Sequence, residues 1–200
     1  MEIEYHVDEK LSYTSSTCNH TLKFMTIGQK LDEMSEKYPN STLVMFDDDT
    51  VLTYSIVKQK AQILAQNLLS LGVKKGDRLC LIMPNSYEFV IAMFACAYIG
   101  VASIPLNYLW EPSEVEHAIL KTEPTSLIIF NSPEIKKFFD HNFSEIESCE
   151  RGNFQSARFP SIKNVIVINE HKNNLAYDFS DKNVYFFNEL ESSLLKKDLK

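Results

Sequence analysis

The chain has 200 residues, of which 44% are hydrophobic and 24% charged, and its formal net charge at pH 7 is −7. A chain of this length and composition can build one sizeable apolar core, which indicates a soluble globular protein. Its acidic balance argues against nucleic acid as the main partner, because neutralising a phosphate backbone requires clustered Lys and Arg.

Residues 1–25 are polar and irregular, and the first helical pattern begins directly after them. Thr26 and Gln29 have the spacing of a capping box, in which each side chain bonds the backbone amide of the other residue. A stripe of apolar residues at helical spacing ends before Pro39 and consists of Ile27, Leu31, Met34 and Tyr38.

A hairpin is predicted next, with strands at 42–46 and 51–53 around three aspartates, Asp47, Asp48 and Asp49. We interpret these carboxylates as a solvated turn and not as a metal site. Neighbouring side chains in a tight turn seldom converge on one ion.

The range 52–106 is the most informative part of the chain. Apolar residues recur at helical spacing over 55–71 and Gly72 ends that helix, after which an apolar strand is predicted at 78–83. Ser86 can cap a second helix over 87–99, Gly100 ends it, and a strand follows at 101–104. A strand, a crossover helix and another apolar strand form a βαβ unit, which is typical of a covered parallel sheet.

The same alternation continues downstream. A helix begins at Pro112 and runs to about residue 121, and a second, short helix begins at Pro133. Asn188 is predicted to cap a last helix over 189–195. Strands are predicted at 126–130, 164–168 and 184–187, and surface loops at 149–158 and 169–183. The predicted fold class is therefore α/β, with a mainly parallel sheet covered by helices.

Two segments of the sequence bear on the cellular location of the protein. The uncharged range 89–106 is about long enough to cross a bilayer, but Gly100 and Pro105 interrupt it, so that a helix followed by a strand fits better than a membrane span. The amino terminus is acidic and lacks an apolar centre, so it is neither a secretory signal nor an Arg-rich transit peptide. From this we predict a cytoplasmic protein.

The four cysteines, Cys18, Cys80, Cys96 and Cys149, contain no C-x-x-C pair. Cys80 lies in a predicted strand and Cys96 in an apolar predicted helix. We therefore expect buried free thiols in a reducing compartment, and no disulfide framework.

The residues alone predict neither a catalytic group nor a metal site. The five histidines are widely separated, and no G-x-G-x-x-G or G-x-S-x-G motif is present. Pro84, Asn85 and Ser86 follow the carboxyl end of a predicted parallel strand, where open α/β sheets tend to bind ligands. Their residue types already fit a turn and a helix cap, and we favour that interpretation.

Several segments carry a family resemblance: "TIGQKLDEMSEKYPNSTLVMF", "LTY", "GVKKGDR", "PNSYEFVIAMFACAYIGVASIPLN", "EVEHAILKTEPTSLIIF" and "RFPSIKNVIVI". In this order they resemble the start of the adenylate-forming, AMP-binding acyl-CoA synthetases, and among these the mitochondrial medium-chain type called "family member 2". The resemblance covers about residues 26–195. It implies that residues 26–200 are the amino-terminal part of an AMP-dependent synthetase/ligase domain, and hence an incomplete adenylate-forming enzyme fold.

The resemblance also implies an activity. Such enzymes use ATP and Mg²⁺ to convert a fatty acid to an acyl adenylate and then transfer the acyl group to coenzyme A. It makes a medium-chain fatty acid and coenzyme A the expected partners, and mitochondria the alternative location. In related enzymes the segment that matches Asn107 and Tyr108 lies near the coenzyme A entrance. Basic residues that match Lys136 and Lys137 meet the phosphates of coenzyme A, although two surface lysines are the simpler interpretation.

One family motif has no counterpart in this chain. The phosphate loop, of the form [ST]-[ST]-G-[ST]-[ST]-G-x-P-K, needs glycines so that backbone amides can approach phosphate. The five glycines of this chain stand singly. The 200 residues alone are therefore expected to hold no cofactor, to be inactive, and to self-associate through an uncovered apolar face. The alternative is a non-catalytic binding module derived from the same family.

Overall fold

The structure of the chain is a computed structural model, and it describes residues 23–143, 154–169, 179 and 184–192. The elements in chain order are α1 (Ile27–Lys37), β1 (Thr42–Met45), β2 (Val51–Thr53), α2 (Tyr54–Ser70), β3 (Arg78–Ile82), α3 (Tyr87–Ile99), β4 (Ala102–Leu106), α4 (Pro112–Thr122), β5 (Ser126–Phe130), α5 (Pro133–Asn142), β6 (Asn164–Ile168), β7 (Tyr185–Phe186) and α6 (Phe187–Ser192).

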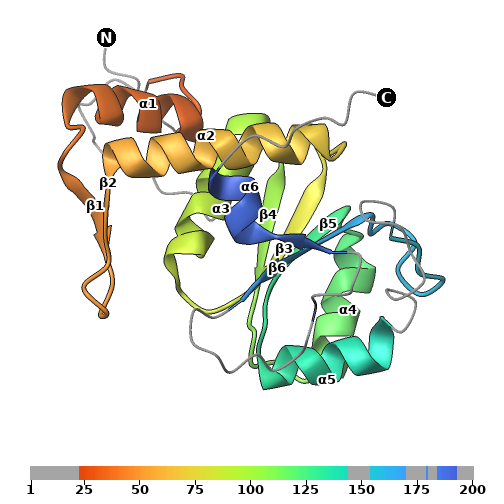
Figure 1. Cartoon of the computed structure of the whole chain (residues 1–200). Helices are drawn as coiled ribbons and strands as arrows, with labels where there is room; N and C mark the ends of the chain where they lie inside the picture. Colours follow the sequence, from red (N-terminus) through yellow and green to blue (C-terminus); the bar gives the residue numbers. More distant parts are fainter. Residues whose placement is uncertain (1–22, 144–153, 170–178, 180–183, 193–200) are drawn as a thin grey trace, which may run out of the picture.

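A parallel sheet in the order β4-β3-β5-β6-β7 forms the centre of the structure (Figure 1). The hairpin β1-β2 is a separate antiparallel pair, as predicted. In register, Cys80 of β3 pairs with Ile104 of β4 on one side and with Leu127 of β5 on the other. The predicted parallel arrangement of these three apolar runs is confirmed. Because the chain continues from β3 to β4 on one side and then to β5 on the other, the direction of winding reverses at β3.

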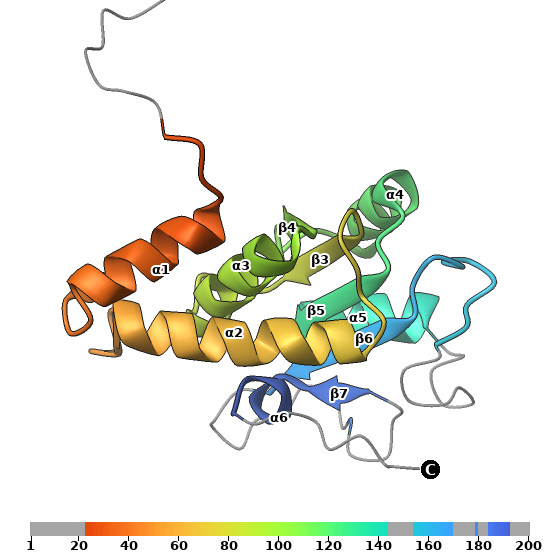
Figure 2. The same cartoon turned by 90° about the horizontal axis from the view of Figure 1, so that it is seen from above.

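The two faces of the sheet belong to two apolar cores, because successive side chains of a strand point to opposite faces. In β3, Leu79 and Leu81 belong to the core that includes α2, α3 and α6, whereas Cys80 and Ile82 belong to the core that includes α4 and α5. Figure 1 shows α2 on one side of the sheet and α5 on the other, and Figure 2 shows α2 and α3 side by side. The structure is therefore a three-layer α/β/α sandwich.

Capping side chains fix the helix starts that the sequence predicted. The Gln29 amide donates to Thr26 Oγ1 at 3.1 Å, and the Thr26 amide donates to Gln29 Oε1 at 2.8 Å, which completes the capping box of α1. The Phe89 amide donates to Ser86 Oγ at 3.4 Å at the start of α3. Gly100, with φ 69°, ends α3 in the left-handed conformation that glycine adopts without steric cost.

A carboxylate and a glycine join α1 to the rest of the structure. Asp32 Oδ1 accepts a hydrogen bond from the Tyr98 hydroxyl at 2.8 Å and lies 3.1 Å from Lys58 Nζ. Gly28 lies against the Tyr98 ring, and a Cβ built on it would be 2.8 Å from Tyr98 Cδ1. A side chain at this position would force the helix and the ring apart, so glycine permits the close contact.

The predicted face of α1 was wrong. Ile27 is 65% exposed, and the buried residues of α1 are Gly28, Leu31 and Ser35. The contact between Gly28 and the Tyr98 ring turns this face of the helix inward, so only Leu31 of the predicted apolar stripe is buried.

The last helix also differs from its prediction. It begins at Phe187, so Asn188 lies inside the helix and does not precede it. Phe187 is only 2% exposed, and its burial in the core brings the start of the helix forward. The strand predicted at 101–104 is β4, which begins at Ala102 and extends through Pro105 to Leu106.

Several predictions fall on other parts of the chain. Residues 1–22, most of the predicted loops, and both Cys18 and Cys149 lie outside the described residues. Within the described residues, no helix is both long and apolar enough to cross a membrane.

The two described cysteines, Cys80 and Cys96, are buried free thiols, as predicted. Burial raises the pKa of the Cys80 thiol to about 11 and that of the Cys96 thiol to about 12. The unfolded chain releases these protons at a lower pH than the folded chain. We therefore expect a free energy of unfolding that is insensitive to these thiols below about pH 8 and falls above about pH 9, by at most about 1.4 kcal/mol per pH unit and thiol.

Urea unfolding between pH 7 and pH 10.5 measures this loss. The double variant Cys80→Ala/Cys96→Ala is the control, because its stability should decline less steeply with pH than that of the parent chain. Equal slopes for the two proteins would contradict the assignment.

Candidate functional site

Three pockets lie where the parallel strands end, which is the edge at which open α/β sheets bind ligands. The residues that form them come from the ends of β3, β4, β5 and β6 and the turns after them, from the start of α3, from β7 and α6, and from the β1-β2 hairpin turn. This edge is the candidate functional site. Its position follows from the topology, because parallel strands direct all their carboxyl ends to one side.

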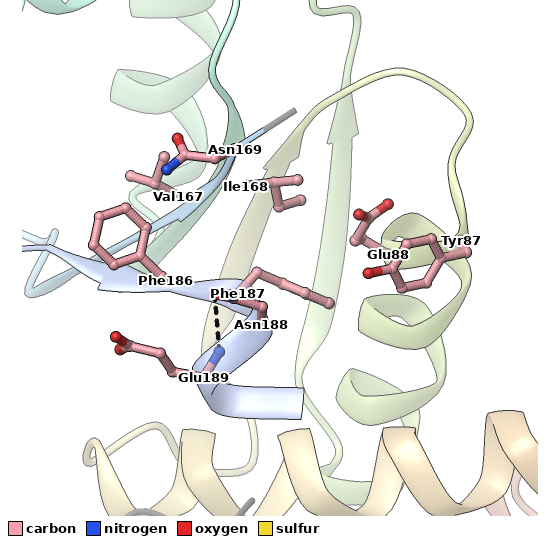
Figure 3. Close-up of a pocket in the computed structure, with 9 residues that line it drawn as sticks. All are labelled: Tyr87, Glu88, Val167, Ile168, Asn169, Phe186, Phe187, Asn188 and Glu189. Atoms are coloured by element: carbon pink, nitrogen blue, oxygen red, sulfur yellow. Dashed lines mark hydrogen bonds between the residues drawn. The ribbon is translucent and has the colours of Figure 1, made fainter. Parts of the chain in front are cut away.

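The first pocket, which we call the α3–α6 pocket, has a volume of about 250 Å³. Figure 3 shows Tyr87 and Glu88 on α3 opposite Ile168 and Phe187. Its lining residues are Tyr87, Glu88, Val167, Ile168, Asn169, Phe186, Phe187, Asn188 and Glu189.

The second pocket, which we call the switch-point pocket, has a volume of about 210 Å³ and lies where the winding of the sheet reverses. Asn85 and Ser86 reach it from the end of β3, and Phe130 reaches it from the end of β5. The hairpin turn contributes Asp47 and Asp48. It shares three lining residues with the α3–α6 pocket, so the two are adjacent: Tyr87, Glu88 and Asn169.

The first turn of α3 places two of the three shared residues, Tyr87 and Glu88. Ser86 caps the helix, so Tyr87 and Glu88 are its first two residues. Glu88 is only 7% exposed, and its carboxylate lies in the turn where free backbone amides stabilise negative charge. The sequence interpretation of Ser86 as a helix cap is confirmed, and the structure adds that Asn85 and Ser86 also line a pocket.

Polar contacts hold α6, which forms one wall of the α3–α6 pocket. Lys60 Nζ of α2 lies 2.9 Å from Glu191 Oε1, and the Tyr87 hydroxyl donates to the same oxygen at 3.4 Å. The amide of Asn67 donates to the Leu190 carbonyl at 2.7 Å. Burial raises the pKa of the Tyr87 hydroxyl, and the nearby carboxylates of Glu88 and Glu191 raise it further. Tyr87 therefore remains a neutral hydrogen-bond donor at physiological pH.

The third pocket, which we call the β3–β4 pocket, has a volume of about 340 Å³. It contains two of the residues predicted from the sequence, Asn107 and Tyr108. Asn107 is exposed and its Oδ1 accepts a hydrogen bond from the Leu109 amide at 3.0 Å, while Tyr108 is half-buried. The lining residues are Met83, Pro84, Asn85, Phe89, Pro105, Leu106, Asn107 and Tyr108.

The two predicted lysines lie on another element. Lys136 and Lys137 are on α5, which follows β5, and neither lines the β3–β4 pocket. Lys136 forms an ion pair with Asp140 one turn later in the same helix. The structure thus brings Asn107 and Tyr108 together in one pocket and places the lysine pair apart from it.

The charged residues that line the three pockets restrict the kind of ligand that these pockets can bind. Among the described residues that line the three pockets there is no Lys, Arg or His, whereas Asp47, Asp48, Glu88 and Glu189 carry carboxylates. Such walls can accept hydrogen bonds from a ligand, but they offer no cation for a triphosphate. The described residues also include no group of three or more His, Cys, Asp or Glu side chains that could hold a metal ion.

Sequence reasoning missed Tyr87, Glu88 and Asn169. Each lies within a few residues of the carboxyl end of β3 or β6, so the rule that predicts ligand sites at these ends could have identified them. Their apolar neighbours made Tyr87 and Glu88 look like an ordinary helix start. The contribution of the hairpin turn could not be predicted, because it depends on how β1-β2 packs against α2.

Comparison with known proteins gives a consistent result. Residues 31–190 match the family model described as AMP-binding enzyme. The chain is 31% identical over 160 residues to the mitochondrial medium-chain acyl-CoA ligase of Danio rerio, with 78% of this chain and 26% of that protein covered. It is 29% identical over 162 residues to the corresponding protein of Homo sapiens, with 79% and 26% covered. The chain spans about a quarter of the length of these relatives.

Solved structures share the fold. Acetoacetyl-CoA synthetase from Streptomyces lividans superposes with a TM-score of 0.67 at 15% identity, covering 86% of this chain and 26% of that one. The anthranilate CoA ligase AuaEII in complex with anthranoyl-AMP gives a TM-score of 0.63 at 20% identity, with 83% and 27% covered. At these identities the likeness shows the fold alone.

The ion pair that holds α6 can be tested directly. Lys60→Met leaves the Glu191 carboxylate, whose side chain is 6% exposed, without its cation. We expect the free energy of unfolding to fall by about 1–3 kcal/mol, less than for a fully buried pair because Lys60 is one-third exposed. Urea unfolding measures the change. The double variant Lys60→Met/Glu191→Gln should recover part of the loss, and a single variant as stable as the parent would refute the assignment.

Proposed function

The chain belongs to the AMP-binding enzyme family, and from that premise we propose that it is the amino-terminal part of a fatty acid–CoA ligase. The observation that carries this proposal is the family match over 160 residues, from 31 to 190, in a chain that spans about a quarter of the acyl-CoA ligases it resembles. We place the boundaries of the ligase portion at residues 26–200, with residues 1–25 as an appended segment.

The proposed reaction has two steps. The carboxylate oxygen of a fatty acid attacks the α-phosphorus of ATP and releases pyrophosphate, which gives an acyl adenylate. The thiol of coenzyme A then attacks the acyl carbon and releases AMP. Mg²⁺ held elsewhere in the full enzyme would supply the positive charge that this release of pyrophosphate needs. The described residues do not fit ATP, because those that line the pockets include no cation and the sequence has no glycine-rich phosphate loop. They also do not fit its metal, because they include no group of three or more His, Cys, Asp or Glu side chains that could hold one. We therefore assign these steps to other parts of the full enzyme.

The finer details rest on the relatives. Their names specify a medium-chain acyl-CoA ligase and mitochondria, which supports a medium-chain fatty acid as substrate and the mitochondrial alternative over the cytoplasmic prediction. The non-catalytic binding module remains the competing function.

We further propose that the β3–β4 pocket is the coenzyme A entrance. Asn107 and Tyr108 supply an amide and an aromatic ring on one wall, and Phe89 and Pro105 make much of the remaining lining apolar. Such a wall suits the amide and alkyl groups of a pantetheine arm. Lys136 and Lys137 on α5 are proposed to attract the phosphates of coenzyme A.

The activity of the chain alone is the first test. The 200 residues are expected to show no ATP–pyrophosphate exchange with any fatty acid, because the groups that bind triphosphate are absent from them. A chimera in which residues 26–190 replace the matching quarter of the Danio rerio relative should restore exchange with medium-chain fatty acids. Exchange by the chain alone would show that the phosphate site is misplaced, and a folded but inactive chimera would favour the binding module.

The lysine pair is tested in the same chimera. Lys136→Ala/Lys137→Ala should raise the KM for coenzyme A by about three- to tenfold, because two solvent-exposed contacts to phosphate are lost. Pyrophosphate exchange, which needs no coenzyme A, should stay unchanged. Lys121→Ala on α4 is the matched control and should leave both quantities unaltered. An unchanged KM in the double variant would assign these lysines to the surface alone.

A further inference from the structure

A fourth pocket lies away from the carboxyl edge, beside the edge strand β4. It has a volume of about 410 Å³, and we call it the α3–β4 groove. It runs between the start of α1, one side of α3 and the beginning of β4, which lie together along one side of the molecule (Figure 2). None of its lining residues is charged: Ile27, Met93, Phe94, Ala97, Val101, Ala102 and Ser103.

The composition of α3 indicates that this groove is normally covered. The helix carries apolar residues on every side, and Glu88 in its first turn is its only charged residue. One side packs on the sheet and on α2, but Met93 on the groove side is 36% exposed, and Phe94 and Ala97 are half-buried. A helix that is apolar all round is typical of one surrounded by protein or lipid. The relatives contain additional protein sequence that can provide this cover.

The edge of β4 shows what kind of contact the cover makes. The Ala102 amide donates to the Asp77 carbonyl, so Ala102, Ile104 and Leu106 direct their backbone groups toward β3. The backbone groups of Ser103 and Pro105 therefore point away from β3, toward the open edge of the sheet. Proline has no N–H to donate there. A further strand cannot pair along the whole of β4. The cover must bind mainly through apolar side chains packed against α3.

These observations also argue against a second copy of this chain as the cover. Pairing of two exposed edges is the common way in which sheets self-associate, and Pro105 interrupts it here. Two copies would in addition bring together chains with a net charge of −7 each. The relatives, in contrast, contain about three times as much sequence outside the matched region as within it.

We propose that the α3–β4 groove is the docking surface for the part of the ligase outside this chain, which covers it with an apolar segment. This inference rests on the proposed function, because it takes the occupant from the full enzyme. It assigns to this side of the molecule a role in assembling the enzyme, separate from the ligand edge.

Cysteine accessibility tests the proposal. Met93→Cys and Ala102→Cys introduce thiols at exposed positions in the groove, and Leu120→Cys, at a position 49% exposed on α4, is the matched control. Each variant is made in the 200-residue chain and in the chimera with the Danio rerio relative. Maleimide labelling is followed at the level of the peptide by mass spectrometry, and circular dichroism verifies that each variant is folded.

The expected result is that both groove thiols react readily in the chain alone and at least tenfold more slowly in the chimera, while the control reacts equally in both. Equal labelling of the groove thiols in both proteins would overturn the proposal. Protection that appears in the chain alone as its concentration rises would also overturn it, by showing that a second copy occupies the groove. Ligase activity of the chimera is measured separately: a protected but inactive chimera contradicts only the proposed function, and an active chimera with reactive groove thiols contradicts only this inference.

Discussion

The parallel sheet must be covered on both faces, and the other features of the structure depend on this constraint. Parallel strands have no solvated face, so their residues supply two apolar cores in alternation, as Cys80 and Leu81 do in β3. The crossover helices provide the cover, with α3 on one face and α4 and α5 on the other. The same connections place every turn after a strand at one edge. The polar residues in those turns form the candidate site because the sheet is parallel.

The candidate site and the α3–β4 groove lie on different sides of the molecule and differ in chemistry. The carboxyl edge is rich in carboxylates and amides and accepts hydrogen bonds, whereas the groove beside β4 is apolar. Neither carries the clustered cations that a triphosphate requires.

Much of the fold follows from local sequence signals. Strands β5 and β6 have the predicted bounds, because each is a continuous apolar run whose ends are marked by turn residues. The sequence also predicted the helix-capping residues Thr26 and Ser86, and the structure confirms both. The failures have tertiary causes. A close contact between Gly28 and the Tyr98 ring decides which face of α1 is buried, and no local pattern encodes that contact. The same holds for the pockets, whose walls come from segments far apart in the chain.

The hydrogen bond from Asn67 to the Leu190 carbonyl joins residues that are 123 positions apart. At typical rates of translation, the ribosome adds that many residues in roughly 6 to 25 seconds. During this interval α2 has been made, but Leu190 has not. The side-chain amide of Asn67 cannot yet donate to the Leu190 carbonyl, and the core side chains of α2 lack Leu190 as a neighbour. The nascent chain therefore presents an unfinished surface for much of its synthesis.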